Sequence, residues 1–320
     1  MAALKNLFIL LLSVLLLLAT VAAFAQDKDD DDDDDKPANL SAVMKPGQQP
    51  AGTRYDCPYE KGFQRAQRIG GYTLRLLPAG KSGNVRCRAT LTASNGKVTT
   101  VTADWALTVD KISGTDINGD GKPELVLDGY SGGAHCCYSY TIIGLGQTHQ
   151  VLRTLHSQVP MTFEGQADGS TVIRTGDSVF DYFVVPHSDA VIPQLILRMD
   201  GNKLLDVGAQ FHKEYDAQIE QARAQLSSQD LEKFHQARLG DRMFGDQTLT
   251  VHRVLVIVLN YLYSGREAQA WQALTELWPP SDQARIKSLI LERRNRGLLK
   301  EVALGDAEAA QHADTGQSRF

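Results

Sequence analysis

A nine-residue stretch, DINGDGKPE at residues 116–124, carries acidic and amide side chains at alternate positions. Its first, third and fifth residues offer side-chain oxygens, its seventh a main-chain carbonyl and its ninth a carboxylate. Calcium takes about six to eight hard oxygen ligands at flexible geometry, and Gly121 permits the sharp reversal that a tight loop around an ion needs. The sequence therefore predicts a structural Ca²⁺ site with the ligands Asp116, Asn118, Asp120, Lys122 (through its carbonyl) and Glu124.

The same stretch resembles the calcium loop of FG-GAP repeats, the β-propeller blades of integrin α subunits. In that loop D-x-N-x-D-G-x-x-D/E is followed by an apolar strand, and the resemblance covers residues 109–144 in a single copy. It implies a β-rich fold and the same five ligands. An EF-hand is excluded because its twelfth position requires Glu, where this chain has Leu127. A polar β-turn without metal is the alternative, since Asp and Asn favour turns.

The sequence GYSGG at residues 129–133 fits the G-x-S-x-G pattern of a nucleophile elbow. Ser131 would then be the nucleophile of an exported serine hydrolase. That elbow needs a helix after the serine, whereas a β-branched and aromatic segment follows. The pattern therefore favours a glycine-rich turn between strands, with the hydrolase as an alternative function.

His135, Cys136 and Cys137 form a second candidate site, for a soft metal or for redox chemistry. Adjacent side chains of a strand point to opposite faces, so both cysteines cannot reach one ion without a kink. Structural cysteines are therefore favoured.

The chain has four cysteines, and export to an oxidising compartment predicts that all four are in disulfides. A bond between Cys57 and Cys87 would tie the start of the first domain to a strand and leave Cys136 and Cys137 as a neighbouring pair. Alternatively, one of that pair reaches Cys57 or Cys87. The sequence leaves these pairings open.

The first residues predict export. Lys5 precedes an apolar run at residues 7–18, and the Ala-Phe-Ala at 23–25 fits the rule for signal-peptidase cleavage. We therefore expect residues 1–25 to be a signal peptide and the mature chain to be secreted or periplasmic, with no stable membrane span. An uncleaved anchor is the alternative, but the run is shorter than the about 20 residues that a span requires.

Residues 26–52 are expected to form an acidic, disordered linker. Its DKDDDDDDDK run holds eight Asp and two Lys, and charges of one sign at this density repel one another and oppose folding. The run is also similar to an epitope tag or a protease site. Since the whole chain has a net charge of −5, the remainder is close to neutral. The absence of a basic patch argues against nucleic acid and leaves a protein or glycan ligand.

The elements that position these residues predict an α+β fold. Short strands rich in Val, Thr, Ile and Tyr fill residues 53–211, with hairpin turns at 94–97 and 200–202 and a strand at 180–185. We expect an antiparallel β domain, either partly propeller-like or sandwich-like. No helical segment interrupts the strands, which disfavours a parallel α/β sheet.

A helical bundle is predicted at residues 212–303, followed by a disordered tail at 304–320. Gly240 is expected to end a helix, and further breaks are expected at Ser264–Gly265 and at Pro279–Pro280. The segment 250–280 resembles a tetratricopeptide-type helical hairpin, although a compact bundle is the favoured interpretation. Together the motifs predict an exported, non-catalytic calcium-binding protein with a binding or structural role outside the cytoplasm.

Overall fold

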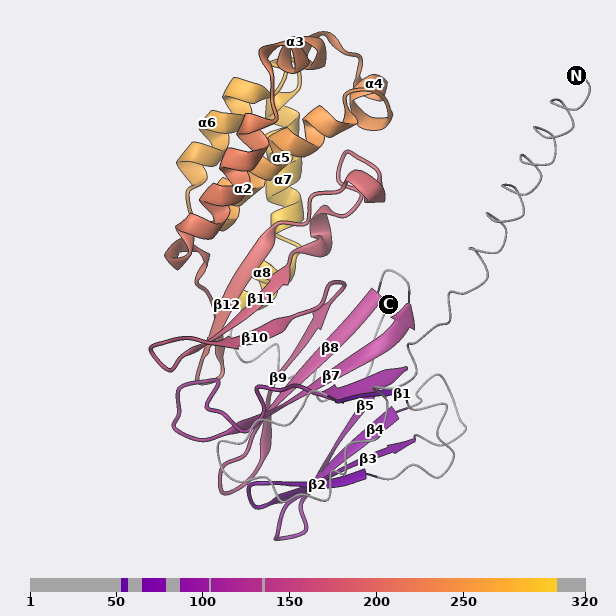
Figure 1. Ribbon diagram of the computed structural model, residues 1–320, viewed down its shortest axis with the longest axis vertical. Helices are drawn as coiled ribbons and strands as arrows, with labels where there is room; N and C mark the ends of the chain where they lie inside the picture. The colour runs from indigo at the N-terminus through magenta and orange to yellow at the C-terminus, as the bar shows by residue number, and fades with distance from the viewer. Residues whose placement is uncertain (1–52, 57–64, 79–86, 104, 134–135, 304–320) are drawn as a thin grey trace, which may run out of the picture. The chain divides into compact units, whose positions relative to one another are not determined.

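The computed structural model describes residues 53–56, 65–78, 87–103, 105–133 and 136–303. The predicted signal peptide, acidic linker and C-terminal tail lie outside these residues. Within them the chain first forms strands and then helices (Figure 1). This order confirms the predicted α+β class.

Five antiparallel strands make the central sheet, in the spatial order β1-β6-β7-β8-β9. β7 and β8 form its longest hairpin. The apolar residues of β7 are buried on both faces of the sheet. Its sequence is therefore a continuous apolar run rather than an alternation of apolar and polar residues. The strands are β1 (Thr53–Asp56), β6 (Ala106–Val109), β7 (Glu124–Gly133), β8 (Cys136–Gly144) and β9 (Gln150–Ser157).

Four antiparallel strands, in sequence order, make the N-terminal sheet. β3 and β4 alternate buried with more exposed residues, as expected where only one face is covered. The predicted turn at 94–97 joins β4 to β5, and β5 contacts β7 of the central sheet. The strands are β2 (Arg65–Ile69), β3 (Tyr72–Pro78), β4 (Cys87–Thr92) and β5 (Val98–Ala103).

The C-terminal sheet packs against the central sheet, and side chains of both belong to one apolar cluster. Tyr140 of β8 packs its ring 5.9 Å from that of Phe163 and accepts a hydrogen bond from the Met161 N–H at 2.8 Å. The predicted turn at 200–202 joins its last two strands. The described residues form no closed barrel or propeller. The strands are β10 (Thr162–Gly165), β11 (Thr171–Gly176), β12 (Gln194–Asp200) and β13 (Lys203–Asp206).

The strand predicted at residues 180–185 is wrong. The segment begins in the 3-10 turn η1 (Ser178–Phe180) and continues as turns, with Tyr182 and Val184 in the left-handed region at φ 53° and 50°. Phe183 lies between these two residues and Val185 follows them, and each is only 3% exposed. Burial of these side chains in the core has overridden the β propensity of the sequence.

Helices fill the chain from residue 212 onward, as predicted, and breaks occur after α5 at Ser264–Gly265 and after α6 at Trp278–Pro279. Gly240 does not end a helix: α3 already ends at Gln236, and Gly240 lies inside the short α4. The helices are α2 (His212–Ala224), α3 (Ser228–Gln236), α4 (Leu239–Phe244), α5 (Thr248–Tyr263), α6 (Glu267–Leu277), α7 (Gln283–Arg294) and α8 (Leu298–Ala303).

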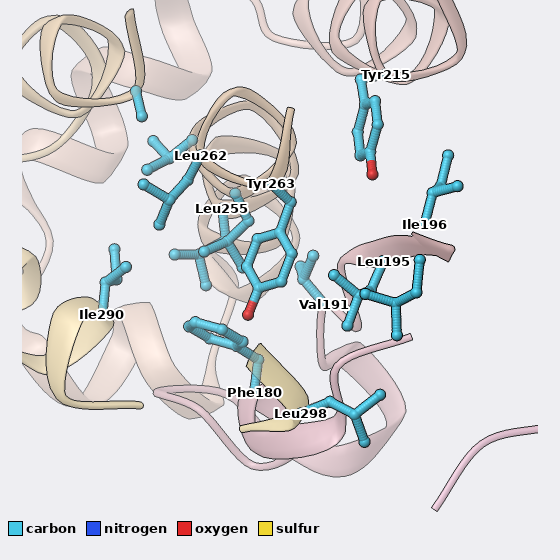
Figure 2. Packing of buried hydrophobic residues seen from close by; sticks show 14 of the residues in the cluster. Phe180, Val191, Leu195, Ile196, Tyr215, Leu255, Leu262, Tyr263, Ile290 and Leu298 are labelled. Carbon is cyan, nitrogen blue, oxygen red and sulfur yellow. The ribbon is translucent and has the colours of Figure 1, made fainter. Parts of the chain in front are cut away.

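One hydrophobic core joins the C-terminal sheet to the helices. α5 is buried on nearly all sides, because residues Val254–Leu259 are apolar all round, and it contacts β12, α2, α4 and α6. Figure 2 shows side chains of α5 and α8 packed with Phe180 and the residues of β12. The last sheet and the bundle therefore fold around a shared core.

Candidate metal centre

The loop predicted to bind calcium connects β6 to β7, and main-chain hydrogen bonds fix its two ends. The Glu124 N–H donates to the Thr115 carbonyl at 2.9 Å, and the Gly114 N–H donates to the Glu124 carbonyl at 2.7 Å. Just beyond, the Val126 N–H donates to the Ser113 hydroxyl at 2.9 Å. The intervening residues must therefore close a tight loop on a rigid base.

Inside the loop, the acidic and amide side chains turn back onto its main chain. Both carboxylate oxygens of Asp116 accept N–H groups, from Gly119 at 2.7 Å and from Gly121 at 2.8 Å. The two glycines adopt φ of 79° and 80°, a region that favours residues without a Cβ. Asn118 Oδ1 accepts the Asp120 N–H at 3.0 Å. The loop is thus wrapped around its own oxygens.

Glu124 is the buried member of the set, with 1% of its surface exposed. Its Oε2 accepts the Ile117 N–H at 2.6 Å. The pKa of Glu124 is raised to about 7, chiefly by burial and also by the negative charges of Asp116 and Asp120, against the opposing effect of that hydrogen bond. The carboxylates predicted as ligands are therefore close enough to repel one another.

The donor set agrees with calcium in its chemistry. Every predicted ligand is a hard oxygen, and such donors select calcium or magnesium over soft metals. In the part of the chain that the structure describes, no group of three or more His, Cys, Asp or Glu side chains is arranged to hold a metal ion. A calcium site here depends on the Asn118 amide and the Lys122 carbonyl as well as on carboxylates. Its occupancy stays a prediction.

A hollow of about 330 Å³ lies beside the loop, and turns from the central and C-terminal sheets border it. The Gly201 N–H in the β12–β13 turn donates to the Asn118 carbonyl at 2.8 Å. Arg153 of β9 donates through Nε to the Asn202 carbonyl at 2.7 Å. The loop is therefore bonded directly to the C-terminal sheet.

The N-terminal sheet anchors the β8–β9 turn, which forms another wall of the hollow. His149 accepts through its carbonyl from Lys97 Nζ at 2.9 Å, and its Nε2 lies 2.7 Å from the Thr99 hydroxyl. These contacts anchor the β8–β9 turn, whose residues Gly146 and Thr148 line the hollow. The central and C-terminal sheets therefore line the hollow directly, whereas the N-terminal sheet reaches it through the β8–β9 turn.

Comparison with known proteins adds no assignment: no protein-family model, curated protein or solved structure matches the chain. Among the described residues, no helix is both long and apolar enough to cross a membrane.

Ser131 lies within β7, where its hydroxyl accepts the Cys137 N–H at 2.7 Å. β8 follows from Cys136, so this serine is placed in a β-hairpin and lacks the strand-to-helix turn of a nucleophile elbow. Its hydrogen bond joins the two strands of the hairpin. The arrangement is that of a structural serine.

The cysteine pattern is described in part. Cys87 and Cys137 each take part in a disulfide, and none of the described cysteines is free. His135, Cys57 and the side chain of Cys136 lie outside the described residues. The pairing of the four cysteines therefore stays a prediction, as does the His-Cys-Cys metal or redox site.

Sequence reasoning missed a second buried carboxylate, Asp177, at the junction between the sheet and the helices. It is 1% exposed and accepts the Tyr263 hydroxyl at 2.6 Å and the Val179 N–H at 3.4 Å. A Cβ added at Gly297 would clash with its carboxylate, so the residue just before α8 packs directly on Asp177. No local signal could have revealed Asp177, because Tyr263 lies 86 residues further along the chain.

Proposed function

We propose that the chain is an exported, non-catalytic protein that binds one structural Ca²⁺ in the loop at residues 116–124. The observation that carries the proposal is the burial of Glu124 beside two further carboxylates, Asp116 and Asp120. Without a cation, this concentration of negative charge opposes folding. A divalent cation bound by hard oxygens would remove that repulsion.

The proposed role of the ion is to hold the β6–β7 loop of the central sheet against a turn of the C-terminal sheet. The predicted ligands Asn118, Lys122 and Glu124 line the hollow where turns of the central and C-terminal sheets meet. The carbonyl of Asn118 also accepts the hydrogen bond from Gly201 of the C-terminal sheet. An ion that orders the loop would therefore strengthen the contact between sheets. The resemblance to the FG-GAP loop supports the same ligand set.

The proposed cellular location and the proposed class of binding partner are based on the sequence. A signal peptide at residues 1–25 would place the protein in the periplasm or outside the cell, where millimolar calcium sites are common. There the β sheets would act as a binding or structural module for a protein or glycan ligand.

Thermal unfolding of the full chain in calcium and in chelator tests the proposal. Calcium at a hundredfold excess over its dissociation constant should add about 2.7 kcal/mol to the free energy of unfolding. Because extracellular-type sites bind at about 10⁻⁴ to 10⁻³ M, about 10 mM Ca²⁺ is a hundredfold excess at the tight end of that range and about a tenfold excess at the weak end. Asp120→Ala should lower the Tm in calcium and abolish the calcium-dependent shift.

The matched control is Ser131→Ala, which changes the neighbouring hairpin and should leave the calcium-dependent shift intact. A wild-type melting curve that does not respond to chelator would show that the loop is a plain β-turn. The acidic run at residues 27–36 is present in every variant, so cations that it collects cannot produce the difference between them.

A further inference from the structure

Lys122 contacts the carboxylate of Asp120 in two ways. Its main-chain N–H donates to Asp120 Oδ1 at 2.8 Å, and its ammonium nitrogen lies 3.3 Å from Asp120 Oδ2. The ammonium group therefore occupies the neighbourhood of a carboxylate that the proposed calcium ion would also need. It is a cation that belongs to the chain itself.

The stem of Lys122 is held over the hollow by Gly146 of the β8–β9 turn. A Cβ on Gly146 would lie 3.2 Å from Lys122 Cδ, so the missing side chain leaves the space through which the lysine passes. Both residues line the hollow. Packing of the stem against the turn thus directs the ammonium group toward the loop, although the lysine side chain remains 56% exposed.

We propose that Lys122 is a built-in counter-ion that competes with Ca²⁺ for Asp120 and sets the affinity of the loop. This inference rests on the proposed calcium site. The carbonyl of Lys122 favours the bound ion, whereas its ammonium group opposes it, because the ammonium must leave Asp120 and then remains near a divalent cation. In calcium-free protein the same group offsets part of the repulsion among the carboxylates.

The expected effect is modest because the ion pair is exposed. Exposed pairs are weak and screened by solvent, so removal of the ammonium charge should tighten calcium binding about two- to tenfold. The effect should shrink as salt is added, since salt screens charges that solvent reaches.

Calorimetric titration of the full chain with CaCl₂ tests the inference. Lys122→Gln keeps the carbonyl ligand and removes the charge, so its Kd should fall about two- to tenfold. Lys122→Arg keeps the charge and should stay within about twofold of wild type. Gly146→Ala should push the stem aside and shift the Kd in the direction of Lys122→Gln.

Lys111→Gln is the matched control, because it removes one exposed positive charge from the same β6–β7 connection without touching Asp120. Equal tightening in Lys111→Gln and Lys122→Gln would overturn the inference in favour of a general charge effect. A wild type that binds calcium together with an unchanged or weaker Lys122→Gln would also overturn it. If neither protein binds calcium, the proposed function itself has failed, and this inference fails with it.

Discussion

Glu124 and Asp177 are both carboxylates with 1% of their surface exposed, yet the protein surrounds them in opposite ways. Asp177 accepts hydrogen bonds from the Tyr263 hydroxyl and from main-chain N–H groups of Val179 and Leu298. Glu124 also accepts main-chain N–H groups, but its charged neighbours are Asp116 and Asp120. Burial raises the pKa of both residues. The protein supplies its own donors at one site and concentrates like charge at the other.

Asp177 is therefore part of a structural contact whose hydrogen-bond donors come from the protein itself. Glu124, in contrast, lies where an external cation would be needed to balance the negative charge. At the sheet–helix junction, Tyr263 is bonded to Asp177, and the ring of Tyr263 packs edge-on to Phe180 at 6.1 Å (Figure 2). Burial and the neighbouring carboxylate also raise the pKa of Tyr263, which keeps its hydroxyl a donor. The joint is therefore complete without a ligand, and calcium should leave it unchanged.

The largest expected effect is at this joint. Asp177→Ala would leave a buried hydroxyl and main-chain N–H groups without an acceptor, and should lower the free energy of unfolding by about 3–5 kcal/mol. Tyr263→Phe removes one donor only and should cost about 1–2 kcal/mol. Denaturant unfolding should give the same losses in calcium and in chelator. Losses that depend on calcium would break the distinction between the two sites.

A pH titration of stability sharpens the comparison at Glu124. Its pKa is about 7 in the folded chain, against an ordinary value of 4.5 for glutamate, so between these pH values the folded chain holds a proton that the unfolded chain releases. The stability that this proton gives is complete below about pH 4.5 and is lost as the pH rises through about 7, by about 3 kcal/mol in total.

Calcium-free wild type should therefore lose stability over this range relative to Glu124→Gln, which cannot ionise. Unfolding at a series of pH values in chelator, for both proteins, measures the difference. Saturating calcium should remove it, because the ion holds the ionised form. Parallel pH profiles for the two proteins would contradict the account of Glu124.

The smallest expected effect concerns Ser131. Ser131→Ala removes the acceptor of the Cys137 N–H and should cost about 1 kcal/mol, without any change in calcium response. A serine-directed fluorophosphonate probe should label neither protein. Labelling of the wild type that is lost in Ser131→Ala would instead establish the hydrolase alternative.

Local chemistry explains what the sequence could predict. The turns at 94–97 and 200–202 and the break at Ser264–Gly265 depend on residues adjacent in the chain, and the closure of the loop at Gly121 depends on its own spacing. The burial of α5 also has a local cause, since its run Val254–Leu259 is apolar on every side.

Contacts between distant residues explain what it could not. β1 pairs with β6, although all four strands of the N-terminal sheet lie between them in the sequence. The segment at 180–185 does not form a strand because the side chains of Phe183 and Val185 are buried in the core. Burial of Glu124 and the approach of Lys122 to Gly146 likewise depend on turns from other strands. The ligand types could be predicted from sequence, but the charge balance around them could not.

Calorimetric titration of chelator-stripped full-length protein with calcium shows whether the loop at residues 116–124 binds the ion. We predict one calcium ion per chain in wild type, and loss of that site in Asp116→Asn/Asp120→Asn, which preserves the size of both side chains. Any weak binding by the acidic run at 27–36 should persist in both proteins and so cancel in the comparison. Identical isotherms for the wild type and the double variant would contradict the claim that the loop at 116–124 is a calcium site.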